Sequence, residues 1–247
     1  MMLNASAFVS HVKMFYPEMS SLTNAEFDRI LLQFTKLQKD NSKRIKARHQ
    51  TVKLNKSKLL RPSSDLGTFM PLAVYKVPKL TDTIWKRPQA NLFKLLQGYL
   101  ARYLAILTDH HSVVFINLQK AKLLQAEVDY QNRAVVWVDH HKTDQTFGSA
   151  FMALLPQEVD WLKGLMEVYV HFSREQCLFF FQFDGNQLSK LNTELKAAWH
   201  HAGMQGQISF GLIWTAIANQ AKKHLPVEER KLVYEGMCYD VPTETAA

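Results

Sequence analysis

This sequence is poor in the residues that mark several large classes of protein. Its 247 residues include two cysteines, Cys177 and Cys238, too few for a disulfide framework, so a reducing compartment, the nucleus or the cytoplasm, is expected. No 18 apolar residues run together, which argues against a membrane span. The first residues also lack the basic head and long apolar stretch of a secretory signal. No membrane partner is therefore expected.

Short sequence motifs of several common binding and catalytic sites are missing as well. The chain contains no Gly-rich phosphate loop, no C-x-x-C pair and no nucleophile-elbow motif. No cofactor is therefore expected. The remaining composition, 47% hydrophobic and 21% charged residues, is that of a packed domain and not of a disordered chain.

Positive charge is concentrated in one short stretch. Of the 30 basic and 22 acidic residues in the chain, ten basic residues and a single acid, Asp40, lie between Lys36 and Arg61. Dense cationic charge suits the phosphate backbone of double-stranded DNA, because each neutralised phosphate releases condensed counterions. A solvated helix face or a localisation signal is the alternative explanation. The predicted DNA contacts are Lys39, Lys43, Arg44, Lys46, Arg48, Lys53, Lys56 and Lys58.

The first 88 residues are predicted to form a helical, basic arm followed by a linker. Residues 18–61 contain neither glycine nor proline, and Thr23 with Glu26 has the spacing of a capping box. A helix is therefore expected to begin near Asn24 and to continue into the basic stretch. Four prolines punctuate residues 62–88, which predicts a linker with short helical turns.

Residues 89–247 are predicted to form a second domain, mainly α with a small antiparallel β-hairpin (α+β). Apolar residues at helical spacing and β-branched runs identify its elements. The expected strands are 134–138, a returning strand at 150–155 and an apolar strand at 178–183. The expected helices are 91–108, one that Pro156 opens, 188–203, 212–223 and 226–237.

Several segments of this second domain resemble a known family in order and spacing. Val136–Thr143 resembles the hairpin of tyrosine recombinases, in which a strand leads to an H-K-T turn. The resemblance covers roughly residues 90–247 and points to the Crypton-like eukaryotic branch of these DNA-breaking and DNA-joining integrases. Further matching segments are Leu178–Phe180, the W-x-x-A-G ending at Trp199–Gly203, Ser209–Ala218 and Met237–Asp240. The resemblance implies a recombinase catalytic-domain fold with the basic helix on its N-terminal side.

The resemblance also implies that the catalytic residues are lost. In the family a tyrosine attacks the scissile phosphate, two arginines hold its oxygens, and a hairpin lysine protonates the leaving oxygen. Here His111 and Trp214 stand at the places of the arginines, Gly211 at that of a histidine, and Tyr239 at that of the supporting histidine. The nucleophile is expected one position beyond Ala247, so of the catalytic set only Lys142 remains. The implied protein binds DNA without cutting it.

Two alternatives remain open at this stage. The first is a protein-interaction module that uses the same helical scaffold. The second is a manganese phosphoesterase, because Asp109–His111 and Asp139–His141 both spell D-H-H, and histidine and aspartate are metal ligands. Adjacent histidines on a strand point to opposite faces, so they could not share one metal ion. No metal site is therefore expected. Tyr234 or Tyr239 could supply a hydroxyl in place of the lost nucleophile, but neither replaces the arginines.

Overall fold

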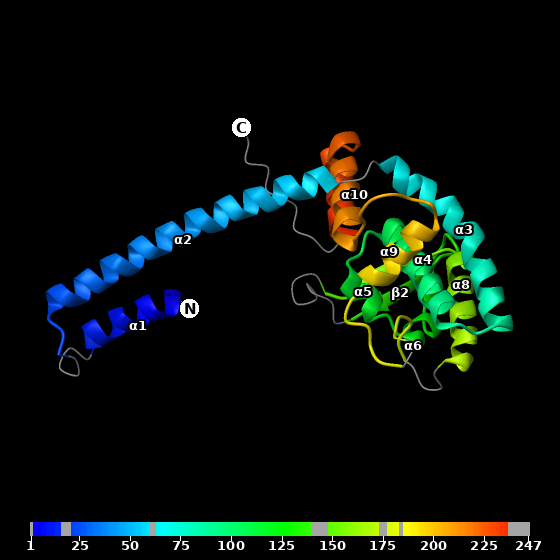
Figure 1. The fold of residues 1–247 in the computed structure, drawn as a ribbon, viewed down its shortest axis with the longest axis horizontal. Coiled ribbons are helices and arrows are strands. Elements are labelled where there is room, and N and C mark those ends of the chain that lie inside the picture. Colours follow the sequence, from blue (N-terminus) through cyan, green and yellow to red (C-terminus); the bar gives the residue numbers. More distant parts are fainter. Residues whose placement is uncertain are drawn as a thin grey trace. The chain divides into compact units, whose positions relative to one another are not determined.

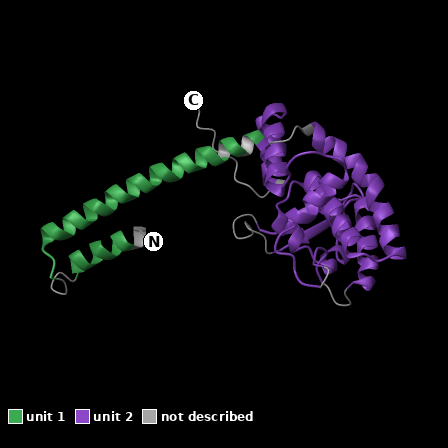
Figure 2. Ribbon diagram, in the orientation of Figure 1, with its two compact units in different colours: residues 1–58 green, residues 59–247 purple. Residues whose placement is uncertain are grey.

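In a computed structural model, the chain divides into two compact units, residues 1–58 and residues 59–247 (Figure 2). The structure describes residues 2–15, 21–59, 63–139, 148–172, 177–182 and 185–236. The boundary between the units falls after Lys58, whereas the sequence placed a domain boundary after residue 88. Among the described residues, no helix is both long and apolar enough to cross a membrane.

The first unit consists of helix α1 (Met2–Phe15) and the long helix α2 (Asn24–Leu59) (Figure 1). The predicted capping box is confirmed: Thr23 N and Oγ1 each donate to Glu26 Oε2 at 2.7 Å, and Glu26 N donates to Thr23 Oγ1 at 3.3 Å. These two bonds from Thr23 also lower the pKa of Glu26. An ion pair joins Lys13 of α1 to Asp28 of α2, so α1 folds back beside the first turns of α2.

The second unit opens with a long helix where a linker was predicted. Helix α3 (Ser63–Lys86) runs through Pro71 and Pro78, so the linker prediction was wrong. Both prolines lie on the exposed face of the helix, and the opposite face is an apolar stripe packed into the core. This stripe stabilises the helix despite the two missing amide donors. Its buried residues are Leu66, Phe69, Ala73, Val77, Leu80 and Ile84.

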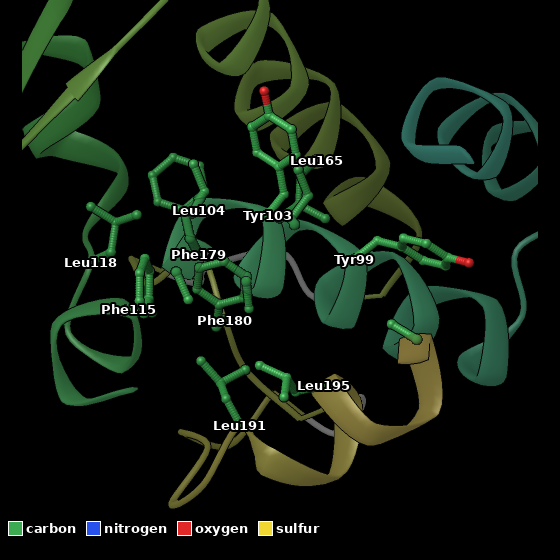
Figure 3. Packing of buried hydrophobic residues seen from close by; sticks show 14 of the residues in the cluster. Tyr99, Tyr103, Leu104, Phe115, Leu118, Leu165, Phe179, Phe180, Leu191 and Leu195 are labelled. Carbon is green, nitrogen blue, oxygen red and sulfur yellow. The ribbon is translucent and has the colours of Figure 1, made fainter. Parts of the chain in front are cut away.

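Helix α4 (Ala90–Thr108) lies at the centre of the second unit, as its apolar periodicity predicted. Around it pack α3, helix α9 (Asn192–His201) and aromatic residues of the segment 178–181 (Figure 3). The contact with α9 depends on Gly98, because a Cβ there would lie 2.1 Å from the Glu194 carbonyl oxygen. Glycine thus permits the close approach of the two helices.

The described residues of the segment 178–183, which are 178–182, do not form the predicted strand. Leu178 and Phe181 make only isolated bridges, to Gln119 and Gln187. The side chain of Gln97 replaces a strand partner: its Nε2 donates to the Phe181 carbonyl at 3.0 Å, and Phe181 N donates to its Oε1 at 3.1 Å. A buried backbone needs hydrogen-bond partners, and here a core amide supplies them.

A small antiparallel sheet of order β1-β2-β3 confirms the predicted α+β class. The predicted hairpin is β2 (Ala134–Val138) with β3 (Ala150–Leu154), and Val136 pairs with Met152 at its centre. The short strand β1 (Glu127–Val128) and the five-residue helices α5 (Ser112–Ile116) and α6 (Lys120–Leu124) were not predicted.

The remaining helices agree with the predictions in kind but not always in length. Helix α8 begins with Pro156 as predicted, whereas α9 begins at Asn192 and not at Leu188. Helix α10 is capped by Ser209, whose side chain accepts from Leu212 N. A 3-10 turn follows α8. The bounds are α8 Pro156–Val168, η2 Tyr169–His171, α10 Phe210–His224 and α11 Val227–Gly236.

Candidate functional site

The turn after α4 contains the first of the five positions that the resemblance aligns with recombinase catalytic residues, here called the relic positions: His111, Lys142, Gly211, Trp214 and Tyr239. Asp109 ends the helix in the left-handed conformation, with φ 59° and ψ 15°, and its amide donates to the Ala105 carbonyl at 3.1 Å. Aspartate tolerates this conformation better than most residues. The chain then reverses so that the two histidines point to different parts of the fold: His110 lies 2.7 Å from the Phe151 carbonyl of β3, and His111 faces helix α10.

His111 and Trp214 come together, as the resemblance to recombinases required of the two arginine positions. Their rings stack with centroids 5.6 Å apart and an angle of 23° between their planes. Gly211 lies one turn earlier on α10, and a Cβ there would meet no atom closer than 4.0 Å. Three of the five relic positions therefore belong to one neighbourhood. Lys142 and Tyr239 lie outside the described residues.

The stacked pair changes what this neighbourhood can bind. Two guanidinium groups would present a fork of charged donors to the oxygens of a phosphate. An indole ring presents a single neutral N–H donor, and an imidazole at most two. The pair instead forms an aromatic contact that helps to hold α10 against the turn after α4.

A half-buried carboxyl beside the stacked pair, that of Asp109, makes the neighbourhood still less suited to an anion. Burial raises the pKa of Asp109 to about 7, and its Oδ1 has no hydrogen-bond partner. The carboxyl lines a cavity of about 360 Å³ together with Ile217 and His224 of α10 and Val233 of α11. Sequence analysis missed this group, because aspartate in a helix-ending turn is ordinarily exposed.

The buried Arg102 does not substitute for a lost arginine. It is fully buried in α4, with its guanidinium 3.7 Å from the centroid of the Trp199 ring and 4.6 Å from that of Phe69. Its Nη1 donates to the Leu195 carbonyl at 3.4 Å, and burial lowers its pKa to about 8. A guanidinium enclosed by two rings cannot reach a phosphate at the surface.

The D-H-H triplets do not gather into a metal site in the part of the chain that the structure describes. No three or more histidine, cysteine, aspartate or glutamate side chains of those residues form a metal-binding group. Asp139 is bound to Lys122, 2.6 Å from its Oδ2, and to Ser149, 2.6 Å from its Oδ1. His140 and His141 lie outside the described residues. In the first triplet, His110 lies beside β3, His111 faces α10, and Asp109 lines the cavity.

The predicted nucleic-acid interface lies on α2. Six of its eight predicted cations are exposed: Lys39, Lys43, Arg44, Lys46, Arg48 and Lys58. Lys53 and Lys56 belong to the same helix, and their side chains are outside the described set. Because Lys39, Lys43 and Lys46 are spaced by four and three residues, they share one face of the helix, together with Thr35 and Ser42.

The fold is similar to that of tyrosine recombinases of known structure. A XerH site-specific recombinase bound to its difH substrate, in a pre-cleavage complex, matches 74% of this chain and 47% of its own, with a TM-score of 0.51 and 14% identity. The XerH post-cleavage complex with palindromic difH matches the same shares, with a TM-score of 0.50 and 13% identity. These matches confirm the predicted recombinase-like fold. The chain spans about half the length of the recombinase chain.

No protein-family model matches the sequence. No curated protein matches it either. The similarity to recombinases is therefore one of fold.

Proposed function

We propose that this protein binds double-stranded DNA through α2 and does not cut it. The observation that carries the proposal is the row of exposed cations on α2 in a chain with a recombinase-like fold. Both recombinase structures named above are DNA complexes. Such a role agrees with origin from the Crypton-like branch and with action in the nucleus.

The proposed lack of cleavage rests on the stacked His111 and Trp214. Removing one preorganised stabiliser of a developing oxyanion costs about 3–4 kcal/mol in barrier height. Both arginine positions here carry aromatic side chains in place of guanidinium groups, and Asp109 lies beside them with no donor to offer when ionised. The side chains of the described neighbourhood therefore stabilise each other and leave no cationic clamp for the phosphate.

We predict that DNA binding weakens steeply with salt. If about five cations of α2 neutralise phosphates, the logarithm of the association constant falls with the logarithm of salt concentration with a slope of about 4 to 5. A 30-base-pair duplex carrying a fluorescent label, titrated by anisotropy between 50 and 300 mM NaCl, measures this slope. A protein-interaction module would show no measurable affinity for the duplex at any of these salt concentrations, and that result would refute the proposal.

We also predict that the protein leaves DNA intact. Incubated with supercoiled plasmid and then denatured, it should yield no nicked circles and no protein covalently attached to DNA. An active recombinase on a plasmid with its own target site serves as the positive control. A covalent adduct that disappears in Tyr234→Phe or Tyr239→Phe would overturn the claim of inactivity while leaving the DNA-binding claim in place. Nicking that requires added manganese would favour the phosphoesterase alternative.

A further inference from the structure

The cavity that Asp109 lines, here called the α10–α11 cavity, has the size of a small-molecule site. Its volume is about 360 Å³, at the lower end of the range of such sites, which is roughly 300–1,000 Å³. One face of α10 forms a wall, because Ile217, Ala221 and His224 follow one another at spacings of four and three residues. Helix α11 packs on α10 and adds Val233. The cavity therefore has room for a compact ligand.

The lining of the α10–α11 cavity is mainly apolar. Aliphatic carbon atoms come from Ile217, Ala221, Leu225 and Val233. The ionisable side chains among the described lining residues are Asp109 and His224, and no lysine or arginine is among them. Aliphatic walls suit a ligand with an apolar body, because binding removes the apolar surface of both from water.

The Asp109 carboxyl gives this apolar cavity a single strong acceptor. Its Oδ1 is buried and has no hydrogen-bond partner among the described residues. An acceptor buried in this way costs free energy, which a donor from a ligand would recover. The end of α4 fixes the position of the residue, since the Asp109 amide donates to the Ala105 carbonyl. Burial raises the pKa of Asp109 to about 7, and no described cation beside it opposes this rise.

A cationic donor matches this acceptor better than a neutral donor or an anion. When the carboxyl is ionised, a hydrogen bond from an ammonium group is roughly twice as strong as one between neutral groups. An anion would meet a like charge. Because one carboxylate oxygen is buried without a partner, one N–H donor satisfies it, and the paired donors of a guanidinium are not needed. The acceptor and the walls together indicate an ammonium group on an apolar body.

We propose that the α10–α11 cavity binds a small primary amine with a compact apolar body, whose ammonium group donates to Asp109 Oδ1. The aliphatic walls cover the apolar body. The site lies in the second unit, uses no residue of α2 and does not rest on the proposed DNA binding. Because its walls come from the turn after α4 and from two helices, a bound amine stabilises the packing of these elements.

Two amines and their neutral counterparts test the class of ligand. Cyclohexylamine and benzylamine are cations at pH 8, whereas cyclohexanol and benzyl alcohol are neutral molecules of nearly the same shape. Saturation-transfer NMR titrations of the full chain at pH 8, up to 20 mM ligand, measure the dissociation constants. We expect each amine to bind about tenfold more tightly than its alcohol. Equal affinities, or no binding of either amine, would overturn the proposal.

Asp109→Asn tests the anchoring carboxylate. The variant keeps the size of the side chain and removes its charge, and we expect it to bind the amines about tenfold more weakly and the alcohols as before. Asp160→Asn is the matched control, because Asp160 is exposed on α8 and its replacement changes the net charge equally. Amine affinity that is unchanged in Asp109→Asn, or that falls equally in both variants, would overturn the role of Asp109.

Val233→Phe tests the location of the site without touching Asp109. The larger ring fills the α10–α11 cavity, so we expect both the amines and the alcohols to lose their binding. Leu232→Phe is the matched control, since Leu232 lies on the same helix and is 68% exposed. Thermal unfolding followed by circular dichroism checks that both variants are folded. Amine binding that survives Val233→Phe would place the site elsewhere and overturn the proposal.

Discussion

Reversing the charge of Lys43, Arg44, Lys46 and Arg48 to glutamate is expected to abolish binding to duplex DNA. The change removes four cations that are exposed on α2 and places four carboxylates in their positions, where they repel phosphate. Losing four counterion-releasing contacts alone lowers the affinity by roughly a thousandfold near physiological salt. Anisotropy with a labelled 30-base-pair duplex measures the loss.

A charge-matched control distinguishes the α2 surface from net charge. Lys86, Arg87, Lys94 and Lys163 are exposed cations of the second unit, and their reversal to glutamate changes the net charge of the protein equally. We expect the control variant to keep most of the affinity, because long-range attraction is screened beyond about 10 Å at 0.1 M salt. Glutamate and lysine have similar helix propensities, so α2 should remain helical by circular dichroism. Equal loss in both variants would reject α2 as the binding surface.

Replacing Asp109 by asparagine is expected to stabilise the protein at pH 8 and to leave its stability at pH 4 almost unchanged. The folded-state pKa of Asp109 is raised to about 7 from an ordinary value of 3.8. Below pH 3.8 both states hold the proton, so the group contributes nothing. As the pH rises from 3.8 to 7, the unfolded chain loses the proton first, and stability falls. The full loss is at most about 4 kcal/mol, which corresponds to the difference between the folded and unfolded pKa values.

Asparagine suits this test because it also tolerates the left-handed backbone of Asp109. The free energy of unfolding, measured by urea denaturation of wild type and variant from pH 4 to 8, should differ increasingly as the pH rises. Asp129→Asn is a control of opposite sign, because hydrogen bonds from Arg133 and Gln131 lower the pKa of Asp129. That variant should lose stability above pH 4. A pH-independent effect of Asp109→Asn would show that the carboxyl is ionised at no cost in the folded state.

Local patterns predicted the elements whose stability is local. The capping box at Thr23 and the apolar periodicity of α4 placed two long helices, and the β-branched run 134–138 placed a strand. Helix α3 was missed because its prolines suggested breaks, while its stability comes from packing on α4 and α8 that no local pattern reveals. The segment 178–183 was misassigned for a similar reason, since its backbone partner is the side chain of Gln97.

The candidate site, like the fold, could be predicted from the sequence only in part. The order of the motifs predicted that His111, Gly211 and Trp214 lie in one neighbourhood. The stacking of His111 on Trp214 and the burial of Asp109 could not be predicted, because both depend on how α10 and α11 close over the turn after α4. Residue types at a site follow from the sequence, but their mutual contacts require the fold.

The stacking of the His111 and Trp214 rings bears on whether an arginine at either position could bind a phosphate. An arginine introduced at position 111 alone would lie against the indole, which attracts a guanidinium through its π electrons and competes with any phosphate for it. An arginine at position 214 alone would lose the ring contact and face an imidazole. Because neighbouring substitutions are coupled, neither substitution alone frees a guanidinium for a phosphate. Two cationic side chains could be presented here only if both positions were changed together.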